Sequence, residues 1–211
     1  MNRARLFVVS APSGCGKGTV LAKAFENRPV YYSVSYTTRK MRPGEKEGVD
    51  YFYVDRRTFE KMISARDFLE YARFNDHYYG TLKLPVLEHL ARGIDVILEI
   101  ETVGGFKVKK AFPDAVLLFI LPPHVSELRR RLEKRGTEEA DVIDKRVKHA
   151  GKEIRDSYRY DYVIMNDDLD DAVRDLLTVI DSVRNSDHNA DRFRTDCDDT
   201  VKLIEKVILD A

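Results

Sequence analysis

The most constraining feature of this sequence is a passage near its start that predicts a strand, a loop and a helix in that order. The apolar run at residues 6–9 is typical of a buried strand, and a helical pattern through Phe25 ends at the helix-stopping Pro29. The loop between them reads Ala11-Pro-Ser-Gly-Cys-Gly-Lys-Gly-Thr19. This order is typical of the opening of a parallel α/β sheet, so we predict an α/β fold.

The composition of this loop predicts polyphosphate binding. Small residues allow backbone N–H groups to converge on phosphate oxygens, the helix N-terminus adds favourable partial charge, and Lys17 supplies a mobile cation. The loop departs from the G-x-x-x-x-G-K-[ST] pattern at Ala11, in place of the first glycine, and at Gly18, in place of a magnesium-binding hydroxyl residue. A glycine-rich turn with a surface lysine is the alternative, but the strand-to-helix context favours phosphate binding. We assign ATP binding to Ala11, Pro12, Ser13, Gly14, Cys15, Gly16, Lys17, Gly18 and Thr19.

Charge and hydropathy limit the classes of partner. The 211 residues include 36 Lys and Arg and 36 Asp and Glu, so the formal net charge is zero and there is no global basic field for nucleic acid or an anionic membrane. The longest apolar stretch, at 115–121, is far below the ~20 residues of a membrane span. Two cysteines, Cys15 and Cys197, form no metal-ligand pattern. We therefore expect a cytoplasmic protein with reduced thiols.

The remaining pattern predicts a mixed arrangement followed by renewed α/β alternation. We expect a short helix at 56–64, and a helical arm rich in arginine and lysine at 126–154. From 185 to 199 the sequence is polar and without periodicity, which indicates a linker to a last amphipathic helix. Further strands are expected at 30–35, 49–54, 68–74, 94–100, 115–121 and 161–165.

Three ordered motifs resemble the nucleotide-monophosphate domain of guanylate kinases. They are Ser-Tyr-Thr-Thr-Arg-Lys-Met-Arg-Pro-Gly-Glu at 35–45, Gly-Val-Asp-Tyr at 48–51 and Tyr-Tyr-Gly-Thr at 78–81. The resemblance runs from about residue 4 to residue 185. It implies a P-loop kinase with a parallel sheet core flanked by helices, an inserted strand-rich GMP-binding region and a helical lid. The implied limits are 4–185 for the domain, about 35–93 for the GMP-binding region, about 126–154 for the lid and 186–211 for a C-terminal linker and helix.

The resemblance implies that the inserted region forms a GMP pocket. Two arginines three residues apart can reach one phosphate dianion with forked donors, and tyrosine hydroxyls add neutral donors. One carboxylate can accept both the ring N–H and the exocyclic amine of guanine. The alternatives are solvated loop arginines, tyrosines that only pack in strands, and a glutamate on the outward side of a half-exposed strand. The implied monophosphate ligands are Ser35, Arg39, Arg42, Tyr51 and Tyr79, and the implied guanine ligands are Glu70 and Thr81.

Two acidic residues and the arm complete the predicted site. Glu99 and Glu101 lie two apart at the end of a buried strand, so we expect them to face the same way at the sheet edge where ligands bind. The resemblance places them beside Mg²⁺ and the acceptor, although aspartate often stands at the position of Glu101. We assign no direct protein ligand to Mg²⁺, which ATP oxygens and water would hold near Thr19 and Glu99.

The arm resembles the family's lid at Arg135-Gly-Thr137 and Lys145-Arg146. Closure would bring Arg135 and Arg146 to the ATP phosphates, which, with Lys17 and Arg42, gives the predicted catalytic set. The resemblance also places Asn166 on the adenine side. We interpret the other arm arginines, Arg129, Arg130 and Arg131, as exposed residues that pair with Glu133, Glu138 and Glu139.

The expected activity is transfer of the γ-phosphoryl group of ATP to GMP, and to dGMP, in purine nucleotide metabolism, with Mg²⁺ as cofactor. One rival is a catalytically inactive guanylate-kinase-like module that binds a protein, and another is a monophosphate kinase for another base. A P-loop GTPase is disfavoured because the sequence lacks an N-K-x-D motif. A homodimer is left open.

Overall fold

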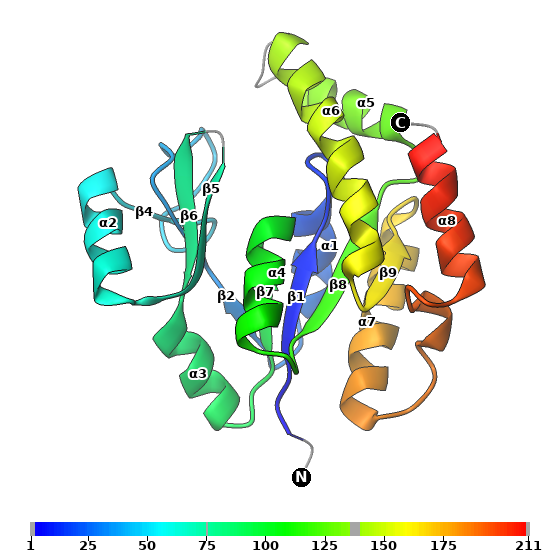
Figure 1. The fold of residues 1–211 in the computed structure, drawn as a ribbon, viewed down its shortest axis with the longest axis horizontal. Coiled ribbons are helices and arrows are strands. Elements are labelled where there is room, and N and C mark those ends of the chain that lie inside the picture. The colour runs from blue at the N-terminus through cyan, green and yellow to red at the C-terminus, as the bar shows by residue number, and fades with distance from the viewer. Residues whose placement is uncertain (1–2, 75, 136–139, 210–211) are drawn as a thin grey trace. The chain divides into compact units, whose positions relative to one another are not determined.

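The computed structural model describes residues 3–74, 76–135 and 140–209 (Figure 1). The chain divides into two compact units. The first unit comprises Arg3–Val8 and Pro29–Ala115, and the second comprises Val9–Arg28 and the chain from Val116 on. Strand β1 (Leu6–Ser10) contributes to both. The strands form a five-stranded parallel sheet in the order β2-β7-β1-β8-β9 and a separate four-stranded sheet in the order β4-β3-β6-β5, which confirms the predicted α/β fold.

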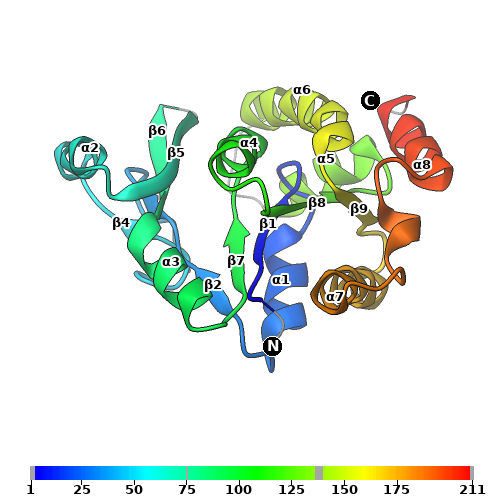
Figure 2. The same ribbon diagram turned by 60° about the horizontal axis from the view of Figure 1, so that its bottom comes forward.

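The first unit contains the mixed sheet. Strand β3 pairs parallel with β4 and antiparallel with β6, and β5 pairs antiparallel with β6. Helix α2 lies beside the β5–β6 hairpin (Figures 1 and 2), and its buried Phe59 stacks on Phe68 and Tyr78. Asp55 begins this helix by accepting a hydrogen bond from the backbone N–H of Thr58. The elements are β2 (Tyr31–Ser33), β3 (Tyr36–Thr37), β4 (Phe52–Tyr53), α2 (Arg56–Ala65), β5 (Phe68–Phe74), β6 (His77–Leu82), α3 (Lys83–Ala91), β7 (Val96–Glu99) and α4 (Thr102–Ala111).

The second unit is built on the parallel pair β8 and β9. All six residues of β8 are buried, which explains the continuous apolar run in the sequence. Helices α1 and α7 pack side by side (Figure 2), and Lys23 of α1 forms an ion pair with Asp170 of α7. Arg28, which follows the end of α1, forms a second ion pair with Asp181 of α7. The elements are α1 (Lys17–Phe25), β8 (Val116–Leu121), α5 (Val125–Arg135), α6 (Ala140–Asp156), η1 (Ser157–Arg159), β9 (Tyr162–Met165), α7 (Leu169–Asn185), η2 (Asp191–Phe193) and α8 (Asp198–Leu209).

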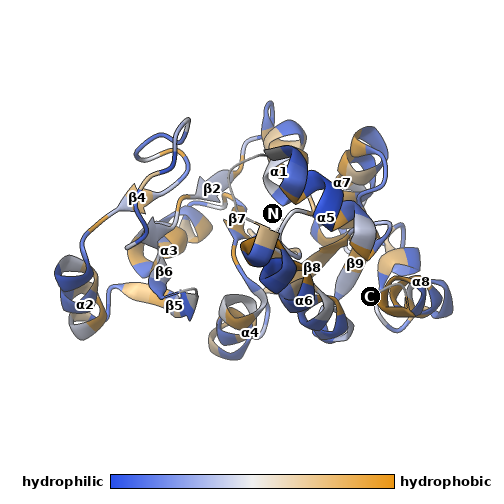
Figure 3. Cartoon of the chain, turned by 90° about the horizontal axis from the view of Figure 1, so that it is seen from above, coloured by the Kyte–Doolittle hydropathy of each residue, from blue (hydrophilic) through white to orange (hydrophobic). Residues whose placement is uncertain are grey.

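The segment expected to be a linker is folded onto the second unit. Ala190 and Phe193 are buried, and the Thr195 hydroxyl donates to the carbonyl of Tyr160 at 2.6 Å. Arg194 forms an isolated antiparallel bridge with Tyr162 of β9. Helix α8 carries both apolar and polar residues (Figure 3) and packs against α6. The segment is held by these hydrogen bonds and by the two buried side chains. Its polar composition does not indicate such packing.

The predicted elements differ most where strands are short. The strand predicted at 68–74 is observed unchanged as β5, whereas the strand predicted at 49–54 is reduced to the two residues of β4. Strand β6 was not predicted. The predicted arm consists of α5 and α6, and residues 136–139 between them lie outside the described residues. Among the described residues, no helix has both the length and the apolar character to cross a membrane.

Candidate active site

The phosphate loop, residues 11–19, lies in the second unit between β1 and α1. Its shape depends on two glycines in the left-handed region, Gly14 at φ 88° and Gly16 at φ 86°. A Cβ atom at Gly16 would lie 2.8 Å from the side-chain nitrogen of Asn166, and one at Gly14 would lie 3.1 Å from Leu132. Helix α1 begins at Lys17, directly after Gly16. The loop therefore leads into a helix N-terminus, where free N–H groups favour an anion.

Two side chains hold the loop through one carbonyl group. Asn166 Nδ2 donates to the carbonyl oxygen of Cys15 at 2.6 Å, and Arg131 donates to the same oxygen at 2.9 Å. Arg131 also reaches the carbonyl of Asn166 at 3.3 Å and pairs with Glu127 at 2.7 Å. The structure thus brings the predicted Asn166 to the loop.

Arg131 is a loop contact that the sequence interpretation missed, because all three arginines of its run were assigned to exposed ion pairs. Arg129 pairs with the predicted Glu133 and also with Asp144, and Arg130 pairs with Glu127. The other predicted partners, Glu138 and Glu139, lie outside the described residues. Buried leucines stand three residues before Arg131 and directly after it, at 128 and 132. This position next to the buried face of α5 was the sequence signal that Arg131 points toward the protein rather than toward solvent.

Cys15 fills space in the loop. Its thiol is 1 % exposed and donates a weak hydrogen bond to the carbonyl of Ile120 at 3.4 Å. Burial raises the pKa of this thiol to about 12, against the lowering effect of Arg131 and Lys17. A thiol that is buried and has so high a pKa is a poor nucleophile, so Cys15 is a packing residue of the loop.

The exposed part of the loop carries the groups suited to phosphate and its metal. Lys17 is half-buried, and Gly18 and Thr19 are exposed in the first turn of α1. Thr19 therefore presents a hydroxyl where Gly18 cannot. Within the described residues, no group of three or more His, Cys, Asp or Glu side chains could hold a metal ion. The exposed hydroxyl of Thr19 is an oxygen ligand of the kind that suits Mg²⁺.

The lid arginines are placed only in part. Arg146 is half-buried on α6, and Arg135 is the last residue of α5. Gly136 and Thr137 of the predicted lid motif lie outside the described residues. Contact of these arginines with ATP therefore stays a prediction.

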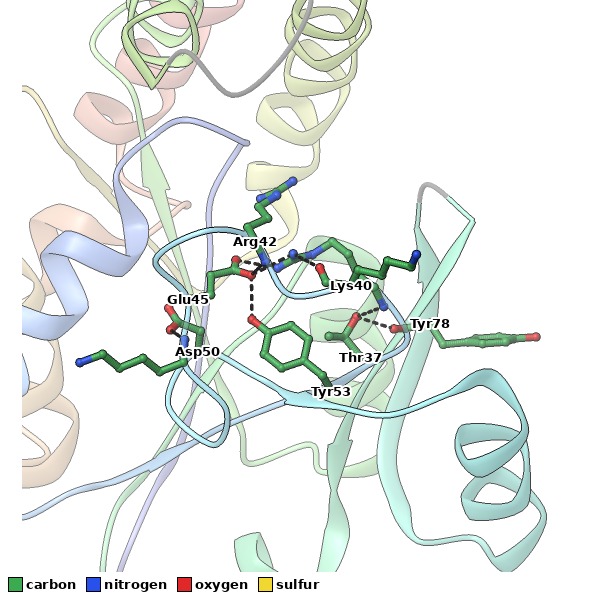
Figure 4. Close-up of polar contacts among 9 residues, drawn as sticks. Thr37, Lys40, Arg42, Glu45, Asp50, Tyr53 and Tyr78 are labelled. Carbon is green, nitrogen blue, oxygen red and sulfur yellow. Dashed lines mark hydrogen bonds and ion pairs between the residues drawn. The ribbon is translucent and has the colours of Figure 1, made fainter.

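The predicted monophosphate pocket, in the first unit, is organised around a carboxylate. Glu45 pairs with the guanidinium of Arg39 through two bonds of 2.7 and 3.0 Å, and it accepts from the Tyr53 hydroxyl and the Arg42 backbone N–H, both at 2.7 Å (Figure 4). The side chain of Arg42 is directed away from Glu45. Burial opposes ionisation of Glu45, but the hydrogen bonds from Arg39, Arg42 and Tyr53 outweigh it and hold its pKa at about 2.

Glu45 and Tyr53 were not assigned to the site from the sequence. Tyr53 was not among the predicted tyrosine ligands, and Glu45 appeared only as the last residue of a motif. Their signal was local. Glu45 lies six residues after Arg39, within reach across a turn that contains Gly44 at φ 88°.

The predicted phosphate-binding tyrosines meet at the same place. The ring of Tyr51 lies edge-on to that of Tyr79, with centroids 5.8 Å apart, and the Arg39 guanidinium lies 5.3 Å from the Tyr51 centroid. Burial raises the pKa of Tyr51 well above its ordinary value, so its hydroxyl is a neutral donor at any physiological pH. Ser35 is buried beside them, and its carbonyl accepts from Phe52 at 2.9 Å.

Glu99 and Glu101 straddle the end of a strand. Glu99 is the last residue of β7, while Glu101 stands directly before α4 and its carbonyl accepts the N–H of Gly105 at 2.9 Å. Tyr32, from the neighbouring strand β2, donates its hydroxyl to the Glu99 carboxylate. Tyr32 was not predicted, and it fixes the orientation of Glu99.

The predicted base-reading pair is formed as a cross-strand contact. Glu70 of β5 lies opposite Thr81 of β6, whose hydroxyl donates to the Glu70 carboxylate at 2.9 Å. Glu70 is only 6 % exposed. Burial raises its pKa to about 7, against the lowering effects of Thr81 and Lys107. Glu70 is therefore not the outward-facing strand residue of the alternative interpretation.

A glycine-rich loop between a parallel strand and a helix, with a separate cluster of arginines, tyrosines and carboxylates, defines a P-loop nucleotide kinase of the monophosphate class. The family model for guanylate kinase matches residues 3–183, and the chain belongs to the guanylate kinase family. The family and class predicted from the sequence are thus confirmed.

Relatives and a solved structure agree with this membership. The chain is 51 % identical over 182 residues to a guanylate kinase of Thermus thermophilus, covering 86 % of this chain and 83 % of the relative. It is 51 % identical over 181 residues to a guanylate kinase of Carboxydothermus hydrogenoformans, covering 85 % and 89 %. The crystal structure of guanylate kinase from Anaplasma phagocytophilum is similar at a TM-score of 0.74 and 33 % identity, over 87 % of each chain.

Proposed function

We propose that this chain transfers the γ-phosphoryl group of ATP to GMP, and to dGMP, giving the diphosphate and ADP. The observation that carries the choice of base is the buried Glu70 carboxylate, bonded to Thr81 at 2.9 Å. In its ionised form it accepts the two adjacent donors of guanine. Adenine presents an acceptor at its ring position and meets repulsion there. The names of the relatives agree with this base.

The acceptor phosphate would be bound by Arg39 and Arg42, with Ser35, Tyr51 and Tyr79 as neutral donors. Glu45 holds Arg39 in a forked ion pair, so that this guanidinium is oriented before any phosphate arrives. Glu99, fixed by Tyr32, and Glu101 would face the acceptor and the metal. Positioning of this kind lowers the entropy lost when the phosphate binds.

The donor phosphates would lie against backbone N–H groups of the phosphate loop. Lys17, Arg135 and Arg146 would neutralise charge that develops on the transferred group, and Asn166 would lie on the adenine side. When bound with ATP, Mg²⁺ would neutralise charge on the phosphate oxygens, and Thr19 and Glu99 stay the residues predicted to lie near it. Phosphoryl transfer requires little covalent chemistry from protein groups, so no general base is assigned. With ATP and GMP as substrates, we infer a cytoplasmic role in purine nucleotide metabolism.

A coupled assay of ADP release with GMP, AMP, CMP and UMP as acceptors tests this proposal. We expect efficient turnover with GMP and at least ~10³-fold lower kcat/KM with AMP, because a mismatched base leaves a buried carboxylate unpaired. Equal turnover with another monophosphate would overturn the choice of base. An absence of ADP release with all four would favour the inactive protein-binding module.

A further inference from the structure

Gly104 occupies a position where the backbone does not require glycine. It is the third residue of helix α4, is buried, and does not have a positive φ angle, in contrast to Gly14 and Gly16. Glycine is a poor helix former, and in the middle of a helix it costs roughly 0.5–1 kcal/mol relative to alanine. Its presence in α4 therefore points to a need for space.

The space beside Gly104 is occupied by the Glu70 carboxylate. A Cβ atom at position 104 would lie 2.8 Å from Glu70 Oε2, 3.2 Å from its Cδ and 3.4 Å from Ile100 Cδ1. Helix α4 packs against β5, the strand that carries Glu70. Separations below 3.0 Å do not persist, so a methyl group there must displace the carboxylate. The atom that gives way is the end of a side chain, so the helix and strand can stay in place.

We propose that Gly104 is a specificity-determining position, which keeps the Glu70 carboxylate in the orientation that accepts both donors of guanine. This inference rests on the proposed function of Glu70. Displacement of the carboxylate would lengthen its 2.9 Å bond with Thr81 and turn it from the line of the two guanine donors. The 2-amino group of guanine is the more sensitive donor, because only a correctly turned carboxylate reaches it together with the ring N–H.

The test compares kcat/KM for GMP and IMP, which differ only in the 2-amino group. In Gly104→Ala we expect the GMP-to-IMP ratio to fall at least ~10-fold, the loss of one charge-assisted hydrogen bond. The dissociation constant for ATP should stay within about twofold of the parent. Val103→Ala is the matched control, because Val103 lies on the same helix and is 55 % exposed. Its GMP-to-IMP ratio should equal that of the parent.

Glu70→Gln separates failure of this inference from failure of the proposed function. If Glu70→Gln keeps the parental GMP-to-IMP ratio, Glu70 does not read guanine and the proposed function loses its support. If Glu70→Gln lowers the ratio but folded Gly104→Ala does not, only the inference about Gly104 is overturned.

A stability cycle tests the contact even if Gly104→Ala folds poorly. The melting temperature is measured for Gly104→Ala in the parent and in Glu70→Ala, where the obstructing carboxylate is gone. We expect the added methyl group to be tolerated better in Glu70→Ala than in the parent. Equal destabilisation in both backgrounds would show that the helix itself requires glycine, and would overturn the inference.

Discussion

The phosphate loop of the second unit and the acceptor pocket of the first unit are preorganised by different means. The loop is held through its main chain, by glycines at positive φ and by the hydrogen bonds that Arg131 and Asn166 donate to the Cys15 carbonyl. The pocket is held through side chains, which converge on the Glu45 carboxylate. Backbone donors need only a fixed loop shape, whereas a guanidinium on a long side chain needs a counter-ion to stay oriented.

The two regions also differ in how strongly they depend on ionisation. The loop presents backbone N–H groups, which do not titrate near neutral pH, and burial raises the pKa of its Cys15 thiol to about 12. The pocket contains one carboxylate with a lowered pKa, Glu45, and one with a raised pKa, Glu70. Substitution of either pocket carboxylate should therefore change the pH dependence of stability, whereas substitution of Lys17 should change catalysis far more than stability.

The largest effect is expected from Lys17→Ala. Removal of the ammonium should lower kcat by ~10²–10³-fold, because it meets charge that grows in the transition state. The melting temperature should stay close to that of the parent. Lys23→Ala, on the same helix and paired with Asp170 at the surface, is the control and should keep parental kcat. Activity within a few fold of the parent in Lys17→Ala would contradict the role of the loop.

Glu70→Gln should stabilise the protein above neutral pH. The folded pKa of about 7 lies above the ordinary 4.5, so Glu70 contributes stability below pH 4.5 that is lost as the pH rises through 7. A pKa difference of this size lowers the free energy of unfolding of the parent by ~3 kcal/mol at pH 8. The neutral amide of Gln does not ionise, so the variant is spared this loss. Urea unfolding at pH 5 and pH 8 measures it. A stability difference between variant and parent that is the same at both pH values would contradict the raised pKa.

Glu45→Gln should weaken GMP binding. Loss of the charged partner frees Arg39, and we expect the KM for GMP to rise ~10–100-fold, as for the loss of one or two charge-assisted hydrogen bonds. The KM for ATP should not change, which would separate the two regions. Glu60→Gln, which only breaks an exposed pair with Arg56, is the control. A parallel rise in the KM for ATP would show that the two regions are not organised independently.

The lowered pKa of Glu45 determines the direction in which its contribution to stability changes with pH. Its folded pKa of about 2 lies below 4.5, so its contribution to stability is present above pH 4.5 and is lost as the pH falls toward 2. The pH dependence of Glu45→Gln should therefore run opposite to that of Glu70→Gln.

Arg131→Gln should give the smallest effect. The shorter glutamine side chain loses the hydrogen bond to the Cys15 carbonyl, but the hydrogen bond from Asn166 to the same carbonyl remains. The loop should therefore keep its position with one contact fewer. We expect the KM for ATP to rise ~3–10-fold and the KM for GMP to stay parental. Arg130→Gln, an exposed neighbour that pairs with Glu127, is the matched control. An unchanged KM for ATP would show that Arg131 only pairs with Glu127.

The strand, loop and helix at residues 6–25 were predicted well, because their residues are contiguous and because the apolar run, the glycines and the helical pattern indicate them together. Glu70 and Thr81 could be assigned only through the family resemblance, since alternation alone permits an outward-facing Glu70. Arg131 was missed because its partner Cys15 lies 116 residues away, and no local pattern predicts a contact at that separation. The folded tail was missed because backbone hydrogen bonds, rather than an apolar run, hold residues 186–197.

The bridge between Arg194 and Tyr162 has a consequence for self-association. Strand β9 is last in the order of the five-stranded sheet, and an outermost strand offers unpaired N–H and C=O groups to any other chain. Arg194 and Thr195, which lie beyond the family match at 3–183, bond to this outer side at Tyr162 and Asp161. The tail thereby occupies the outer side of β9 at Tyr162, so another chain that adds a strand at this position must first displace it.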